Sequence, residues 1–155
     1  EFAIQMLMEY EGKHFANICK DDLDLSTDAE KEAISKKNED SKELLDKMKE
    51  ALGDKVSAVK FSNKLGSHPV SISAEGYVSL EMEKVLSQMP GANQGVKAQL
   101  VLEINSNHSV AEKLEKADDE QLKKYVNLLY SSARLIAGLD IENPTEFSDM
   151  LAEMM

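Results

Sequence analysis

The chain has 155 residues, a formal net charge of −11 at pH 7 and 42% hydrophobic residues, which suits one domain or one domain with an appended element. The excess of acidic residues leaves no basic patch for phosphates, so we expect neither nucleic acid nor membranes as partners. No apolar run approaches a membrane span and no signal peptide is visible, and a single cysteine, Cys19, fits a reducing compartment. We therefore expect a cytoplasmic protein.

The first segment comprises residues 1–26, and the sequence opens at Glu1 rather than Met. Apolar residues within 1–10 suggest the tail of a helix that Gly12 ends. Phe15–Cys19 then suits a short strand. We interpret the chain as a fragment of a longer protein.

A charged segment follows. Alternating acidic positions from Asp22 resemble a calcium loop, but Thr27 stands where the turn glycine belongs and Ala33 where the bidentate glutamate belongs, so we expect no metal there. Thr27 and Glu30 instead form a capping box that starts a helix. Because residues 27–43 carry many charges and few apolar side chains, we expect a solvent-exposed arm or a partly disordered linker.

The middle of the chain predicts an α+β fold. Leu44–Leu52 is amphipathic and Gly53 ends it. Three later segments alternate apolar and polar residues and are predicted to be strands, the last of them central: Val56–Ser62, Pro69–Ser73 and Gln99–Asn105. Helices are expected at Ser79–Met89 and from Ser109, with Glu112 completing its cap, through Leu114. The result is a small three-stranded sheet covered by helices.

The Ser79–Met89 helix carries an apolar face that includes methionines. Methionine side chains adapt to irregular partners, so such a face can bind varied proteins. From the pattern alone, packing of this face on the sheet is the favoured alternative. The residues concerned are Val78, Met82, Val85, Leu86 and Met89.

The segment 118–155 predicts a hairpin of two amphipathic helices. Asp118 caps the first, Gly138 ends it, and Asn143-Pro144 starts the second. A terminal helix this short is marginal in water, so it must pack either on its own domain or on the hairpin of a second copy. The apolar residues that a dimer interface would use are Leu122, Tyr125, Val126, Leu128, Leu129, Leu135, Ile136, Leu139, Phe147, Met150, Leu151 and Met154.

Catalytic motifs are not evident. The sequence has no phosphate-binding glycine loop, paired zinc-binding cysteines or nucleophile elbow. His14, His68 and His108 are far apart and lie beside expected turns. We therefore favour an interaction module over an enzyme, with a small hydrolase built around His108 as the minor alternative.

Five segments of the chain match the motifs of a known family. They are LVLEINSNH at Leu100–His108, SLEMEKVL at Ser79–Leu86, LLYSSARLIAG at Leu128–Gly138, IENPTEF at Ile141–Phe147, and the opening EFAIQMLMEYEGK. Together these segments resemble the heat shock protein 90 chaperones, and they follow that family's order across nearly the whole chain. The chain departs from the family's motifs at three places: Ser106 stands for a usual proline, Glu81 and Lys84 stand for Asn and Arg, and Ser131-Ser132 stand for an acidic-polar pair. Because Glu81 and Lys84 lie on the Ser79–Met89 helix, the resemblance does not define the polar surface of that helix.

The resemblance implies that residues 1–26 are the junction from a middle domain and that residues 27–155 are the C-terminal dimerisation domain of a bacterial member of that family. Its hairpin would form a four-helix bundle with a second copy, and the Ser79–Met89 helix would be exposed to non-native client proteins. The ATP and magnesium site would lie in an N-terminal domain outside this chain, so no catalysis and no cofactor are expected here. The sequence ends at Met155 without an acidic EEVD tail, so we do not expect co-chaperones that bind that tail. Other co-chaperones are still expected as a class of partner. The alternative is a monomeric protein-binding adaptor that uses the Met82 face.

Overall fold

The computed structural model describes residues 9–14, 27–76, 78–88 and 98–153. The chain divides into two compact units, one formed by residues 26–72 and 100–155 and the other by residues 1–25 and 73–99. The sequence suggested 27–155 as one domain; that boundary stays a prediction about a longer protein. Each unit is described by itself.

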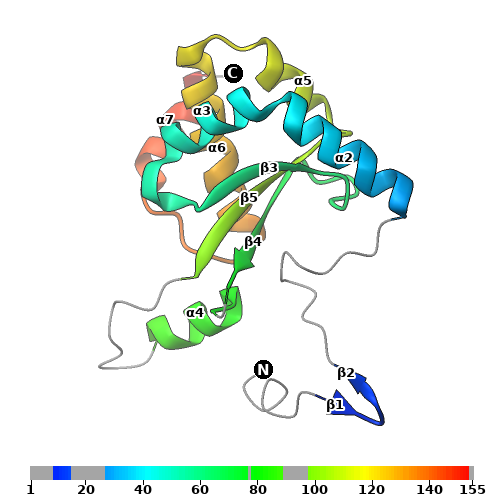
Figure 1. Cartoon of the computed structure of the whole chain (residues 1–155). Helices are drawn as coiled ribbons and strands as arrows, with labels where there is room; N and C mark the ends of the chain where they lie inside the picture. Colours follow the sequence, from blue (N-terminus) through cyan, green and yellow to red (C-terminus); the bar gives the residue numbers. More distant parts are fainter. Residues whose placement is uncertain (1–8, 15–26, 77, 89–97, 154–155) are drawn as a thin grey trace. The chain divides into compact units, whose positions relative to one another are not determined.

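The larger unit begins with two helices (Figure 1). Helix α2 spans Asp28–Asp40 and α3 spans Lys42–Leu52, followed by the short 3-10 turn η1, Gly53–Lys55. The predicted capping box is confirmed, because the Thr27 amide donates to the Glu30 carboxylate over 2.8 Å and the Glu30 amide donates to Thr27 Oγ1 over 3.4 Å. The expected charged arm is a helix with no buried residue that lies against β3. Of the two alternatives for this segment, the exposed arm agrees with the helix, and Asn38 ties that helix to the main chain of Phe61 on β3.

The sheet has three strands in the order β3-β5-β4: β3 is Ala58–Ser62, β4 is Val70–Glu75 and β5 is Gln99–Asn105. β3 and β5 are parallel, with Val59 opposite Leu102 and Phe61 opposite Ile104. β5 is central, as predicted, and all its residues from Leu100 on are buried. The α+β class and the small mixed sheet are confirmed.

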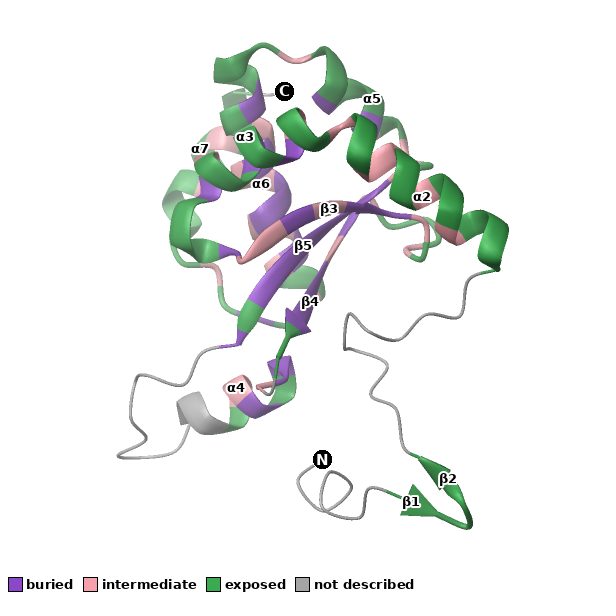
Figure 2. Cartoon of the chain, in the orientation of Figure 1, coloured by how far each residue is buried: buried purple, intermediate pink, exposed green. Residues whose placement is uncertain are grey.

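Helices α5, Ser109–Lys116, α6, Asp119–Ile136, and α7, Pro144–Glu153, complete this unit. α6 packs against α3, and α3 packs against β3. The core is purple in Figure 2. Its most deeply buried apolar side chains come from the sheet and from α3, α5 and α6: Met48, Phe61, Val70, Val101, Leu102, Ile104, Leu114, Val126 and Ala133.

The smaller unit contains a β-hairpin and helix α4, Leu80–Gln88. β1, Glu9–Tyr10, pairs antiparallel with β2, Lys13–His14. The expected helix tail is wrong at this point: Glu11 and Gly12 both have positive φ, 50° and 74°, which forms the tight two-residue turn of a hairpin. The predicted strand Phe15–Cys19 lies outside the described residues.

Within the described ranges, no helix is long and apolar enough to cross a membrane.

Candidate functional site

The ends of the two hairpin helices follow the sequence signals. Asp118 accepts a hydrogen bond from the Gln121 amide over 2.8 Å at the start of α6. Gly138, with φ +69°, ends that helix, and the Leu139 amide donates to the Arg134 carbonyl over 2.8 Å. Asn143 Oδ1 accepts from the Glu146 amide over 3.2 Å before Pro144 opens α7.

One apolar stripe of α6 faces the core of the chain itself. Leu122, Val126 and Leu129 are buried, and Leu139 just after the helix is buried with them. These four residues were predicted to lie in a dimer interface. Because their side chains are covered within one chain, we correct their assignment to core residues, although Leu129, the least buried of them at 9%, also lines the groove described below.

A second stripe of α6 lies beside the first. It follows steps of four, three, four and three residues, the spacing of a helix–helix seam: Gln121, Tyr125, Leu128, Ser132 and Leu135. Tyr125 and Leu128 are half-buried, whereas Leu135 is 50% exposed and the adjacent Ile136 is 51% exposed. The Ser132 hydroxyl donates to the Leu128 carbonyl over 2.8 Å, so this polar member of the stripe is already hydrogen-bonded. This stripe presents apolar surface that the chain leaves uncovered.

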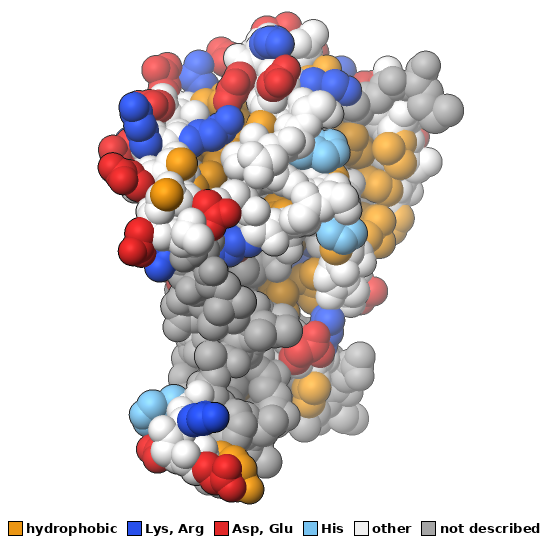
Figure 3. Space-filling model, turned by 90° about the vertical axis from the view of Figure 1, so that its right-hand side faces the viewer, with side chains coloured by type: hydrophobic (Ala, Val, Ile, Leu, Met, Phe, Trp, Pro, Cys, Tyr) orange, Lys and Arg blue, Asp and Glu red, His pale blue; other side chains and the backbone are white. Residues whose placement is uncertain are grey.

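Helix α7 has no buried residue. Leu151 is 42% exposed, Phe147 and Met150 are half-buried, and Met154 lies outside the described residues. α7 contacts α6, where Lys124 Nζ lies 3.1 Å from the Glu153 carboxylate. A hydrogen bond and the charge of Glu153 raise the pKa of Lys124. Figure 3 looks onto the side of the larger unit away from α7, where hydrophobic side chains gather toward one margin and charged side chains toward the other.

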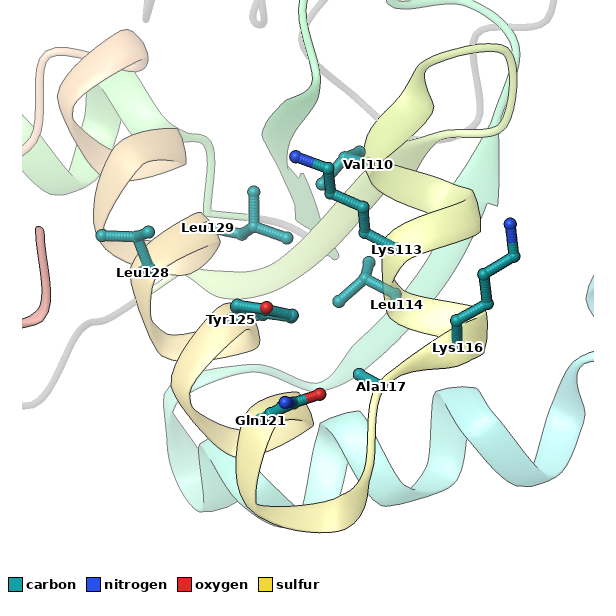
Figure 4. Close-up of a pocket in the computed structure, with 9 residues that line it drawn as sticks. All are labelled: Val110, Lys113, Leu114, Lys116, Ala117, Gln121, Tyr125, Leu128 and Leu129. Atoms are coloured by element: carbon teal, nitrogen blue, oxygen red, sulfur yellow. The ribbon is translucent and has the colours of Figure 1, made fainter. Parts of the chain in front are cut away.

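A groove runs between α5 and α6 and joins the second stripe (Figure 4). Its volume is about 400 Å³. Tyr125, Leu128 and Leu129 line it from α6, and Val110 and Leu114 line it from α5. Lys113 and Lys116 stand on its α5 side. The groove therefore extends the uncovered apolar surface of α6 toward α5.

The segment between α6 and α7 is held by a polar cluster that the sequence did not reveal. Arg134 Nε donates to the Asp140 carbonyl over 2.7 Å, and its Nη1 donates to the Tyr130 hydroxyl over 3.0 Å and approaches Glu142 Oε1 at 3.3 Å. Tyr130 in turn donates to Glu142 over 3.3 Å. Burial raises the pKa of Tyr130, and the hydrogen bond from Arg134 opposes this shift. The one feature of the sequence that could have pointed to this cluster is that Arg134 is one of few basic residues in the hairpin.

Helix α4 is less open than the resemblance implied. Ser79 caps it, as predicted, accepting from the Met82 amide over 3.1 Å. Met82 is only 7% exposed, which favours the alternative that this face packs within the chain, whereas Val85 is 41% exposed and Val78 is half-buried. The side chains of Leu86 and Met89 lie outside the described residues.

His108 takes part in the local structure at the start of α5. His108, rather than the predicted Ser109, is the N-cap of α5, because its Nδ1 accepts from the Val110 amide over 3.1 Å. No group of three metal-ligating side chains occurs among the described residues. His108 thus has a structural role, and Cys19 lies outside the described ranges.

These features describe an α+β domain whose terminal helical hairpin leaves apolar side chains uncovered. The family model described as Hsp90 protein matches residues 1–155, and the chain belongs to this family. It is 48% identical to the chaperone protein HtpG of Clostridium perfringens (strain 13 / Type A), 49% to that of Shouchella clausii (strain KSM-K16) and 44% to that of Bacillus subtilis (strain 168). Each match covers 100% of this chain and 25% of the relative, so the chain spans about a quarter of the length of these chaperones.

Proposed function

We propose that the chain is the homodimerisation module of an ATP-dependent Hsp90-family chaperone, and that its hairpin packs with the hairpin of a second copy as a four-helix bundle. The observation that carries the proposal is the uncovered apolar surface of α6 and α7. Leu135, Ile136 and Leu151 are each at least two-fifths exposed, and α7 buries no residue in its own chain. A helix of ten residues is marginal in water, so a partner that covers it supplies the missing stabilisation.

The second α6 stripe supports a helix–helix seam. Its four-three spacing keeps one side of α6 facing a partner helix over its whole length. A two-fold symmetric pair would bury this stripe on both copies at once, which doubles the stabilisation from each residue. The groove of about 400 Å³ beside Tyr125 and Leu128 gives the partner side chains space to enter.

The role of such a module is to hold two protomers together. A constitutive dimer raises the effective concentration of the remaining domains for each other, including the domain that would bind ATP and magnesium. In this proposal the chain itself has no catalytic role and no cofactor. Non-native clients and co-chaperones are its further partners, and the cytoplasm is its compartment.

A monomeric protein-binding adaptor is the second candidate. Val85 favours it, since this exposed apolar side chain on α4 belongs to the face that the resemblance assigns to client binding. On this alternative the hairpin would stay unpaired, and binding would depend on α4.

Light scattering and sedimentation of the chain over a dilution series decide between the two. We expect a dimer that Leu135→Glu weakens by about a hundredfold, because two symmetric leucines lose about 1.5 kcal/mol each. Ser148→Glu, an exposed polar position on α7, is the matched control and should leave the Kd unchanged. A monomeric wild type, or a Leu135→Glu dimer of unchanged Kd, would contradict the proposal.

A further inference from the structure

We propose that Arg134 is the positioning residue that sets the direction of α7 and thereby presents Leu151 to the second copy. The inference rests on the proposed function. Its starting point is the number of groups that this one side chain joins: the Asp140 carbonyl, the Tyr130 hydroxyl and the Glu142 carboxylate. The first and last belong to the segment leading into α7, whereas Tyr130 belongs to α6.

The cluster is rigid because its members also bind one another. Tyr130 is 3% exposed and donates to the same Glu142 oxygen that Arg134 approaches. The Arg134 side chain is 14% exposed, and its guanidinium lies 5.7 Å from the centre of the Tyr130 ring. Charge-assisted hydrogen bonds are stronger than neutral ones, even though the Glu142 side chain is 50% exposed, and a planar guanidinium fixes their directions.

The backbone of Arg134 holds the same segment. Its carbonyl accepts from the Leu139 amide over 2.8 Å, and Leu139 is buried. The chain is thus fixed at Leu139 by burial and at Asp140 and Glu142 by the Arg134 side chain, with only the Asn143 cap between this anchor and α7.

The remaining contacts of α7 are limited. It has no buried residue, although Phe147 and Met150 are half-buried, and in the described part of the chain its polar tie to α6 is the exposed ion pair of Lys124 with Glu153. An exposed ion pair contributes little, because solvent screens it and two long side chains must be ordered. The direction of α7 is therefore set at its start rather than along its length.

Lys and Met substitutions separate the contributions of Arg134. Arg134→Met keeps an apolar stem but removes all three polar contacts. Arg134→Lys keeps the charge but not the planar fork, so it can satisfy fewer of the three acceptors. Lys124→Met is the matched control, because it removes the charged contact between α6 and α7 that Lys124 makes with Glu153, away from the Arg134 cluster.

The test measures the hairpin and the dimer separately in the 155-residue chain. Spin labels at Lys123 on α6 and Ala152 on α7, which are both exposed, report the distance between the two helices. The labels are attached in a Cys19→Ser background, so that no other cysteine is labelled. An excess of unlabelled chain restricts the signal to pairs of labels within one chain. Sedimentation over a dilution series reports the Kd of the dimer, and circular dichroism reports folding.

For Arg134→Met we expect a broadened distance distribution and at least a tenfold higher Kd. Arg134→Lys should fall between this variant and the wild type, and it serves as the test if Arg134→Met does not fold. Lys124→Met should change the Kd less than twofold. An unchanged distance distribution in both Arg134 variants, or an equal rise in Kd for Lys124→Met, would overturn the inference.

The two proposals fail in different ways. A wild type that stays monomeric at every concentration contradicts the dimer, and with it the part of the inference that concerns Leu151. The distance distributions still decide whether Arg134 directs α7, since they are measured within one chain.

Discussion

Asn38 on α2 pairs with the main chain of Phe61 on β3 as a neighbouring strand would. Its Oδ1 accepts from the Phe61 amide over 2.8 Å, and its Nδ2 donates to the Phe61 carbonyl over 3.1 Å. β3 is an outer strand of the sheet, so one side chain satisfies two edge groups that would otherwise be open to another strand. The same Nδ2 donates to the Ile34 carbonyl over 2.9 Å, which ties the contact to the helix.

We predict that Asn38→Ala lowers the free energy of unfolding by about 1–3 kcal/mol, because both Phe61 groups lose their partner in a partly buried place. Alanine favours the helix more than asparagine does, so the measured loss understates the cost of the missing hydrogen bonds. Urea denaturation followed by circular dichroism measures the difference. Glu39→Ala, at the exposed neighbouring position, should change stability by less than about 0.5 kcal/mol. Equal losses for the two variants would contradict the role of Asn38.

Helix α4 offers a second contrast, between Met82 and Val85. Met82→Glu buries a charge at a position that is 7% exposed, so we expect it to destabilise the fold by about 2 kcal/mol or more. Val85→Glu should leave the melting temperature unchanged, because this side chain already faces solvent. Client binding can then be tested with Val85→Glu, because this variant should remain folded. The measurement is how well the chain suppresses the aggregation of a denatured model protein. If folded Val85→Glu suppresses aggregation as well as the wild type, the contribution of this face to client binding is contradicted.

Much of the fold follows from local sequence signals. The caps at Thr27, Ser79, Asp118 and Asn143 were all found from residue type and spacing, and β5 was identified with its observed bounds. Such signals act within one turn of helix or along one strand, where the chemistry of a few neighbours decides the structure.

The candidate site was harder to predict because it depends on distant packing. Leu122 and Leu135 both lie on apolar stripes of α6, yet the first is buried and the second is half exposed, because other elements such as α3 pack on only part of α6. The pairing of Asn38 with Phe61 joins residues 23 apart in sequence, and nothing near either residue announces it. Periodicity finds apolar faces but does not say what covers them.

His108 provides a test of the helix cap that sequence reading placed one residue too late. We predict that His108→Ala lowers stability by about 0.5–2 kcal/mol, because the Val110 amide loses its side-chain acceptor at the start of α5. His108→Asn supplies an oxygen acceptor and should restore most of the loss. Thermal unfolding measures both variants, with His68→Ala at an exposed turn position as the control. A His108→Ala chain as stable as the wild type would show that the cap contributes nothing.

Tyr130 makes the stability of the hairpin sensitive to alkaline pH. Burial raises its pKa above the ordinary value of 10.0, although the hydrogen bond from Arg134 opposes the shift. In the unfolded chain the phenol loses its proton near pH 10, whereas the folded chain still holds it, so the unfolded state binds fewer protons in this range. The contribution is therefore fully present below about pH 10 and is lost as the pH rises through the folded-state pKa, with a slope of at most about 1.4 kcal/mol per pH unit.

Tyr130→Phe should separate this contribution from the rest of the protein. At pH 7 the variant loses the hydrogen bonds to Arg134 and Glu142, and we expect it to be less stable by about 1 kcal/mol. Above pH 10 its stability should fall less steeply than that of the wild type, because the group that binds the extra proton is gone. Urea denaturation at intervals from pH 7 to about pH 11 measures both slopes, and every other titrating group is common to the two proteins. Parallel slopes would mean that burial of Tyr130 does not govern its ionisation, and the cluster around Arg134 would then have to be more open to water than its packing indicates.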